Sequence, residues 1–295
     1  MATGRPRRSV LYVPGSNARA LAKARQLAAD GLILDLEDAV APSAKDEARA
    51  LVLAELARGG YGHRELVLRV NGEETPWGQA DLTAAARCRA HAVLLPKVES
   101  AESVRAAERA LAVAGAPAEQ AIWCMIETPR GVLRSAEIAG ASPKVACLVM
   151  GTSDLVKDLR ARHTPGRQEV ATALGLTLLA ARAHRLAALD GVHLDLSDDA
   201  GFEASCRQGL EMGFDGKTLI HPRTIEVANR VFSPSPEEVA AARRVIAAHA
   251  DAAAAGKGLV VVDGKLVESL HVENARRLVA LADAIAARSS AQPPK

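Results

Sequence analysis

Aromatic side chains are scarce in this chain of 295 residues, which has three Phe, two Trp and two Tyr. A surface that binds nucleic acid by stacking bases on aromatic rings would lack its platforms. Alanine makes up about a fifth of the chain, a composition that favours helices packed closely on a sheet over an all-β sandwich. Apolar residues at 49% and charged residues at 24% are typical of a soluble globular protein with a sizeable core.

Net charge is also small, because 37 Lys and Arg residues nearly balance 35 Asp and Glu residues and leave a formal charge of +2. Such a balance gives no general attraction to nucleic acid or to an anionic membrane, so we expect neither as a partner. The first apolar run, Val10–Val13, is too short for a secretory signal peptide, and no window approaches a membrane span. The Arg-rich start is similar to a mitochondrial transit peptide, but Val10–Val13 is better interpreted as a core strand, so we expect a cytoplasmic protein.

Closely spaced cysteines are missing as well. Cys88, Cys124, Cys147 and Cys206 lie far apart in the sequence, and no CxxC motif occurs. A zinc site or a disulfide framework would need regularly spaced pairs. We therefore expect four buried, reduced thiols, in agreement with a cytoplasmic location.

Short runs of Val, Leu and Ile alternate with stretches of helical period along most of the chain. This rhythm indicates parallel strands joined by crossover helices. Eight repeats over about 230 residues predict an α/β fold, a closed (β/α)8 TIM barrel, with a doubly wound open sheet as the alternative. No GxGxxG or GxxxxGK motif follows a predicted strand, which disfavours dinucleotide and P-loop sites. The expected strands are Val10–Val13, Leu32–Asp35, Leu66–Val70, Ala92–Pro96, Ala121–Glu127, Val145–Met150, Gly191–Leu194 and Thr218–Ile220.

The barrel pattern ends near Val231, where the segment FSPSP interrupts it. We expect a catalytic barrel domain over residues 1–231 and a C-terminal extension of helices and a β-turn over residues 232–295. Within the extension, residues 237–254 and 271–287 have helical period, and an Asp-Gly pair in residues 258–268 predicts a turn between apolar runs. Because the barrel's own helices should already cover its outer wall, the extension is expected to cover a neighbouring subunit.

Charged residues close most of the predicted strands. Catalytic groups of such barrels project from the carboxyl ends of the strands, so these residues are candidates for the site. The mouth is expected to be rich in carboxylates with a few cations facing them. The candidates are Asp35, Glu37 and Asp38 after the second strand, Arg69 on the third, Lys97 after the fourth, Glu127 on the fifth and Asp154 after the sixth.

Glu127 and Asp154 follow consecutive strands, which are neighbours in a barrel, so their carboxylates can converge. Two hard oxygen ligands suit Mg²⁺, which often takes only one or two protein carboxylates and keeps positions for water or a chelating substrate. Without paired His ligands or Cys ligand spacing, the sequence gives little support for zinc. The alternative is that each acid caps the helix that follows it.

Arg69 is a candidate partner for a substrate carboxylate or thioester carbonyl, because a guanidinium has fixed donors and stays charged. The alternative is a structural ion pair with one of the three acids after the second strand. Lys97 is expected to hold the mouth together by pairing with Glu99 or Asp38.

Seven short segments stand in order at the predicted strands: RSVLYVPG (8–15), LDLEDAV (34–40), LRVN (68–71), LPKVES (95–100), IETPRGV (126–132), GTSDL (151–155) and GFDGKTLIHP (213–222). Together they resemble the citrate lyase β-subunit-like branch of the HpcH/HpaI aldolase family. The resemblance implies a TIM barrel, trimeric or a multiple of trimers. It also implies Mg²⁺-dependent cleavage or formation of the C–C bond of 3-hydroxyacyl thioesters such as malyl-CoA, citramalyl-CoA or a citryl thioester.

Carried over by residue, the resemblance places the metal carboxylates on Glu127 and Asp154 and the arginine for the substrate carbonyl on Arg69. Glu37 and Asp38 match acids that order metal-bound water. Retro-aldol cleavage would leave the enolate of acetyl-CoA, whose negative charge Arg69 and the metal would stabilise.

The resemblance further implies a CoA thioester as substrate and Mg²⁺ as cofactor, with Mn²⁺ as a substitute. Basic residues around the first strand should bind the CoA tail, and Arg8 and Arg19 are the candidates.

One segment departs from the family pattern. The lyases carry G-x-M-[IV]-D in the tail, and its Asp reaches the neighbouring subunit's site and moves a proton of the acetyl methyl group. Here the segment is GKLVE (264–268), so the acid is Glu268, and its extra methylene moves the carboxylate by roughly an ångström. A glutamate at this place is more similar to the malyl-CoA thioesterases, where it would orient water against the thioester. The alternative is that Glu268 is a surface acid on a β-turn arm.

The sequence therefore predicts an Mg²⁺-dependent lyase that cleaves a malyl-CoA-like 3-hydroxyacyl-CoA into acetyl-CoA and a 2-oxoacid. A malyl-CoA thioesterase that uses the same site is the second hypothesis. The third is a citryl thioester lyase subunit that depends on an acyl-carrier protein.

Overall fold

The computed structural model of the chain describes residues 5–254 and 260–290. It divides into two compact units, one over Arg7–Phe232 and one from Ser233 onward. The first unit contains a barrel and the second contains two helices and a β-hairpin.

The first unit is a closed barrel of eight parallel strands, which confirms the predicted (β/α)8 fold and excludes the open-sheet alternative. The last strand pairs with the first, with Leu11 opposite Leu219, and so closes the ring. The strands are β1 (Ser9–Pro14), β2 (Gly31–Asp35), β3 (Glu65–Arg69), β4 (Ala92–Leu95), β5 (Ala121–Ile126), β6 (Val145–Met150), β7 (Ala187–Asp190) and β8 (Gly216–Leu219).

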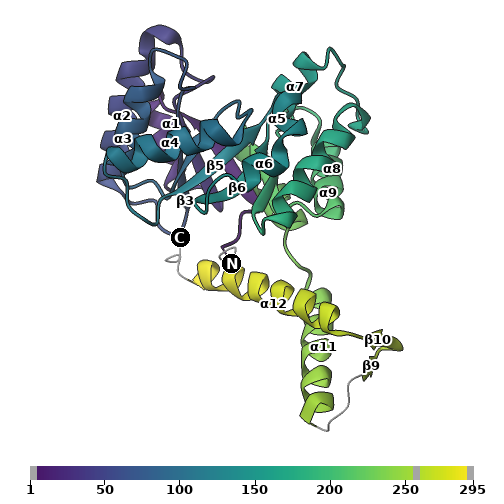
Figure 1. The fold of residues 1–295 in the computed structure, drawn as a ribbon. Coiled ribbons are helices and arrows are strands. Elements are labelled where there is room, and N and C mark those ends of the chain that lie inside the picture. The colour runs from purple at the N-terminus through teal and green to yellow at the C-terminus, as the bar shows by residue number, and fades with distance from the viewer. Residues whose placement is uncertain (1–4, 255–259, 291–295) are drawn as a thin grey trace. The chain divides into compact units, whose positions relative to one another are not determined.

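Helices connect successive strands and lie outside the barrel (Figure 1). Asn17, Ser100, Thr128 and Asp198 cap four of them by accepting hydrogen bonds from backbone N–H groups of the first turn. The helices are α1 (Ala18–Ala24), α2 (Lys45–Arg58), α3 (Gly78–Ala86), α4 (Ala101–Val113), α5 (Pro129–Leu133), α6 (Ser135–Ala139), α7 (Thr152–Asp158), α8 (Gln168–Ala183), α9 (Asp199–Met212) and α10 (Ile225–Val231), with 3₁₀ turns at Pro42–Ala44 and Pro222–Thr224.

Strand residues alternate between two apolar layers. Val67 belongs to the cluster inside the barrel, whereas Leu66 and Leu68 belong to the cluster under the helices. This period of two sends Arg69 to the inside at the carboxyl end of β3. The same alternation along β2, from Ile33, sends Asp35 inside, and the register places Asp35 directly opposite Arg69.

Two predicted strands are displaced in the structure. We expected β7 at Gly191–Leu194, but the strand is Ala187–Asp190 and Leu194 is 51% exposed. We expected β8 at Thr218–Ile220, but it starts at Gly216. The missed residues include Asp190 and Lys217, which form a buried ion pair and which apolar periodicity counts as loop residues.

The second unit contains α11 (Pro236–Ala254), β9 (Val260–Val262), β10 (Lys265–Val267) and α12 (Ser269–Ser290). β9 and β10 are antiparallel, and Asp263 and Gly264 between them have φ of +49° and +76°, as a two-residue Asp-Gly turn requires. The predicted helices and turn are therefore confirmed, while residues 258 and 259 of the predicted turn segment lie outside the described residues. α12 packs against α11, with an ion pair of 2.9 Å between Arg243 and Asp283.

The four cysteines are free thiols; three of them are buried and Cys88 is partly exposed. In the described part of the chain, no helix is long and apolar enough to cross a lipid bilayer.

Candidate active site

A cavity of about 310 Å³ opens at the carboxyl end of the barrel strands. Its wall combines charged residues from the strand ends with apolar residues of β5, β6 and the segment after β7. The charged and polar residues among those that line it include Tyr12, Asp35, Asp38, Arg69, Glu127 and Asp154.

Arg69 is anchored at the bottom of this cavity by Asp35. Its Nε and Nη2 donate to the two oxygens of Asp35, each at 2.6 Å, and both side chains are buried. Asp35 is fixed in turn by the backbone N–H groups of Glu37 and Ala39, at 2.9 and 3.2 Å. Burial alone would lower the pKa of Arg69, but hydrogen bonds to Asp35 and its charge raise it, so Arg69 stays protonated.

The structural ion pair that was the alternative for Arg69 is therefore present. The ion pair with Asp35 involves only Nε and Nη2 of the guanidinium. The third nitrogen, Nη1, lies 2.8 Å from Glu37 Oε2. A bidentate contact with Asp35 fixes the plane of the guanidinium, and Nη1 remains positioned for a second, exchangeable partner.

Lys97 connects the acids of the mouth. Its Nζ lies 2.5 Å from Glu37 Oε1, 3.9 Å from Asp38 and 3.7 Å from Asp154. The expected pairing with Glu99 is wrong, since Glu99 lies 3.5 Å from Arg130 instead, and the contact with Asp38 is longer than the one with Glu37.

Glu127 and Asp154 both line the cavity, as their strand positions predicted. Glu127 is 2% exposed, and its Oε1 accepts a 2.7 Å hydrogen bond from the backbone N–H of Lys97. Lys97 has a left-handed backbone conformation, with φ of +45°, and this conformation orients its N–H toward Glu127. Burial raises the pKa of Glu127 to about 7, so the carboxylate lies in a place where its charge calls for a cation.

The structure removes the capping alternative for Glu127 but leaves Asp154 in a favourable place in the first turn of α7. The cap of α5 is Thr128, and α7, which contains Asp154 in its first turn, has no side-chain cap. Gly151 keeps room beside Glu127, because a Cβ at Gly151 would lie 2.5 Å from Glu127 Oε2. Among the described residues no group of three or more His, Cys, Asp or Glu could hold a metal, but Mg²⁺ needs only one or two protein carboxylates, so this pair fits it.

The remaining predicted site residues lie elsewhere. Arg8 precedes β1 at the end of the barrel opposite the mouth, where its Nε donates to Asp30 at 2.8 Å, and its role in binding the CoA tail stays a prediction. Arg19 is exposed on α1, which follows the carboxyl end of β1, and its binding role stays a prediction. Glu268 is exposed in the second unit, just before α12, and its role also stays a prediction.

Sequence reasoning missed a buried charge network behind the cavity. Lys217 Nζ donates to Asp190 at 2.7 Å, both residues are fully buried, and Arg167 Nη1 also donates to Asp190 at 2.9 Å. Burial would raise the pKa of Asp190, but the charges of Lys217 and Arg167 lower it. Two features of the sequence hint at this pair: Asp190 ends an apolar run, and Lys217 lies in the GFDGK segment.

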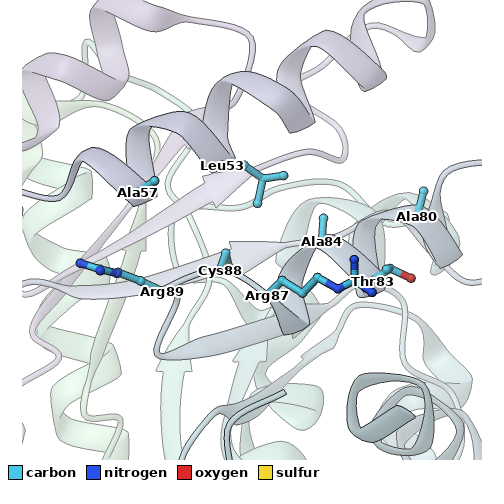
Figure 2. Close-up of a pocket in the computed structure, with 8 residues that line it drawn as sticks. All are labelled: Leu53, Ala57, Ala80, Thr83, Ala84, Arg87, Cys88 and Arg89. Atoms are coloured by element: carbon cyan, nitrogen blue, oxygen red, sulfur yellow. The ribbon is translucent and has the colours of Figure 1, made fainter. Parts of the chain in front are cut away.

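A second cavity, of about 420 Å³, lies on the outer wall of the barrel between α2 and α3. Figure 2 shows Leu53 and Ala57 on one helix facing a side formed by Ala84, Cys88 and Arg87. No carboxylate lines this groove, so it lacks the paired acids and buried arginine that make the mouth the candidate site.

Comparison with known proteins decides the family. The HpcH/HpaI aldolase/citrate lyase family matches residues 8–222. The chain belongs to this family. Its citrate lyase β-type members include enzymes that share the barrel described above.

The chain is similar to three named members of this family. It is 52% identical over 282 residues to the (3S)-malyl-CoA thioesterase of Cereibacter sphaeroides (strain KD131), covering 96% of each chain. It is 37% identical over 284 residues to citrate lyase subunit beta of Escherichia coli (strain K12), covering 95% of this chain and 94% of that one. Among solved structures, CitE from Mycobacterium tuberculosis in complex with magnesium, acetoacetate and coenzyme A matches with a TM-score of 0.76 and 32% identity, over 96% of this chain and all of that one.

Proposed function

We propose that this family member hydrolyses the thioester of a malyl-CoA-like substrate to malate and free CoA. The observation that carries the proposal is the 52% identity, over 96% of both chains, to a (3S)-malyl-CoA thioesterase. The sequence alone ranked C–C cleavage first, and this relative reverses the order of the two hypotheses.

One feature of the site supports hydrolysis at the thioester carbonyl. Addition of water to the carbonyl carbon places negative charge on the carbonyl oxygen, and a fixed cationic donor stabilises that charge. Arg69 supplies such a donor, because Asp35 holds two of its nitrogens and Nη1 faces the cavity. Glu37 contacts Nη1 of Arg69 and is itself held by Lys97.

Glu127 and Asp154 would hold Mg²⁺, with Mn²⁺ as a substitute, and the CitE relative was crystallised with magnesium. The bound ion would polarise oxygen atoms of the malyl group and fix its orientation. Lys97 holds Glu127 through its N–H and lies near Asp154 through its ammonium, so it positions both carboxylates.

We also propose that the C-terminal extension covers a neighbouring subunit and that Glu268 enters that subunit's mouth. There its carboxylate would orient the water that attacks the thioester. The smallest active unit would then be an oligomer, a trimer by family resemblance.

C–C cleavage to acetyl-CoA and glyoxylate is the second candidate, supported by the 37% identity to a citrate lyase subunit beta. Retro-aldol cleavage would leave negative charge on the same thioester oxygen, so Arg69 would serve either reaction. A subunit that acts only on a carrier-bound thioester is the third candidate, which the resemblance to the citrate lyase β-subunit-like branch suggests.

One assay separates the three. Purified protein is incubated with (3S)-malyl-CoA and Mg²⁺, and malate, glyoxylate, acetyl-CoA and free thiol are quantified. Malate and free CoA in equal amounts support hydrolysis, whereas glyoxylate and acetyl-CoA would replace it with cleavage. No turnover of free CoA esters, together with a stable complex with an acyl-carrier protein, would replace both with the third candidate.

A further inference from the structure

Two hydrogen-bond donors inside the barrel point at one weak acceptor. Tyr12 Oη lies 3.6 Å from the sulfur of Met125, and Arg69 Nη1 lies 3.7 Å from the same sulfur. A thioether is a poor acceptor, so in this structure both donors have a partner that a carbonyl oxygen would readily replace. All three residues line the cavity at the mouth.

Strand alternation explains why Tyr12 and Met125 both point into the barrel. Tyr12 follows Val10 by two residues and Met125 follows Trp123 by two, and both Val10 and Trp123 belong to the cluster inside the barrel. The Tyr12 ring also stacks on the guanidinium of Arg69, at 4.8 Å from Cζ to the ring centroid. The stack and the Asp35 contact fix the two donors relative to each other.

The other tyrosine of the chain shows what a purely structural role looks like. Tyr61 also stacks under an arginine, Arg25, at 4.6 Å, but its hydroxyl donates to a strong acceptor, the backbone oxygen of Leu21, at 3.3 Å. In the described part of the chain, the Tyr12 hydroxyl has only the Met125 sulfur as an acceptor.

We propose that Tyr12 Oη and Arg69 Nη1 together form the oxyanion hole for the thioester carbonyl oxygen, in the place next to the Met125 sulfur. This proposal rests on the proposed function and adds Tyr12 to it as a catalytic residue. Water adds to the carbonyl carbon, the oxygen takes the negative charge between the two donors, the C–S bond breaks, and the water proton passes to the leaving CoA thiolate.

Each of the two donors has a property that suits it to this role. The contact of Arg69 Nη1 with Glu37 Oε2 is an ion pair without hydrogen-bond geometry, and Nη1 donates to the Met125 sulfur, so an N–H of Nη1 is available to the substrate oxygen. Burial raises the pKa of Tyr12 above its ordinary value, so the hydroxyl remains a donor throughout the pH range of an assay.

The test compares Tyr12→Phe with Tyr61→Phe, each of which removes one hydroxyl from an arginine-stacked ring. Loss of one oxyanion donor costs on the order of 10²-fold in kcat, so we expect that fall for Tyr12→Phe with KM changed by less than about threefold. Tyr61→Phe should keep the kcat of the unchanged protein. A kcat for Tyr12→Phe within about twofold of the unchanged protein, or a loss confined to KM, would overturn the proposal.

A binding measurement keeps the proposal separate from the overall function. Acetyl-CoA has the thioester carbonyl oxygen, and S-ethyl-CoA lacks it. Calorimetry gives the Kd of each ligand. We expect the unchanged protein to prefer acetyl-CoA and Tyr12→Phe to lose part of that preference, whether or not malyl-CoA is hydrolysed. If the preference is absent, or is the same in both proteins, Tyr12 does not bind the carbonyl oxygen. If it depends on Tyr12 but malate is not formed, the hydrolysis proposal fails alone.

Discussion

Replacing Arg69 with lysine tests whether the site needs a fixed guanidinium and not only a positive charge. Arg69 donates to both oxygens of Asp35 at 2.6 Å, while its third nitrogen lies 2.8 Å from Glu37. One ammonium cannot span these positions. The change keeps the charge but removes at least one charge-assisted hydrogen bond in a side chain that is 6% exposed. Such bonds are worth about 1.5–3 kcal/mol each, so the free energy of unfolding should fall by about that amount.

The barrel contains a matched control at its opposite end. Arg7 donates to both oxygens of Glu65, at 2.7 and 2.8 Å, and is 7% exposed. Arg7→Lys should therefore lose about the same stability, about 1.5–3 kcal/mol, but it lies far from the strand ends that form the cavity. Any difference in turnover between the two variants then reports the position of Arg69 and not the loss of an ion pair as such.

Urea unfolding and turnover of (3S)-malyl-CoA are measured for both variants. We expect Arg69→Lys to lose about 10²–10³-fold in kcat/KM, the range for an oxyanion-stabilising donor, while Arg7→Lys stays within about threefold of the unchanged protein. Equal losses of activity in the two variants would mean that Arg69 acts only through stability. A folded Arg69→Lys protein with more than a tenth of the original kcat/KM would refute the role of its fixed geometry.

Three further outcomes are expected. Glu127→Gln and Asp154→Asn should each abolish turnover and weaken Mg²⁺ binding in calorimetry, while the circular dichroism spectrum stays unchanged. Dialysis of the unchanged protein against EDTA should remove its activity reversibly. Full activity after EDTA dialysis would exclude a role of the metal. Asp190→Asn should destabilise the barrel by about 3–5 kcal/mol near pH 7, because it leaves the buried charge of Lys217 without its carboxylate partner. The pKa of Asp190 is held low, so its contribution to stability is present above the unfolded pKa of about 4 and is lost as the pH falls. The difference in urea midpoint between the unchanged protein and Asp190→Asn should therefore become smaller in acid. Equal midpoints of the two proteins at pH 7 would contradict a stabilising role of Asp190. Mixing inactive Glu268→Ala subunits with inactive Asp154→Ala subunits should restore activity in some hybrids if the site is shared, and exchanged hybrids that stay inactive would remove Glu268 from the neighbouring site.

Residues that close buried strands could be predicted because strand direction in a parallel barrel brings all carboxyl ends to one mouth. That rule identified Asp35, Arg69, Glu127 and Asp154. The same rule puts Arg8 away from the mouth, since a residue that precedes a strand lies at the amino end.

Other features depend on pairing that a single sequence does not display. The partner of Lys97 is Glu37, from a strand two positions away, and only the closed barrel brings them to 2.5 Å. Asp190 and Lys217 lie inside strands because each neutralises the other, so a polarity pattern misplaces the ends of β7 and β8. Tyr12 and Met125 have the inward period of core residues, so the sequence pattern alone does not show that they line the cavity.

Charge pairing in the finished structure gives an independent argument for the metal carboxylates. The guanidinium of Arg69 is matched by Asp35 at two contacts of 2.6 Å, and the ammonium of Lys97 by Glu37 at 2.5 Å. Asp38 is 59% exposed along its side chain, so water screens its charge. Glu127 accepts a hydrogen bond from the backbone N–H of Lys97, and the two lysine nitrogens nearest Asp154 lie 3.6 and 3.7 Å away, farther than the cations that pair with Asp35 and Glu37. We therefore expect this more loosely paired couple of carboxylates, which strand order also selects from the sequence, to be the one that binds a divalent ion.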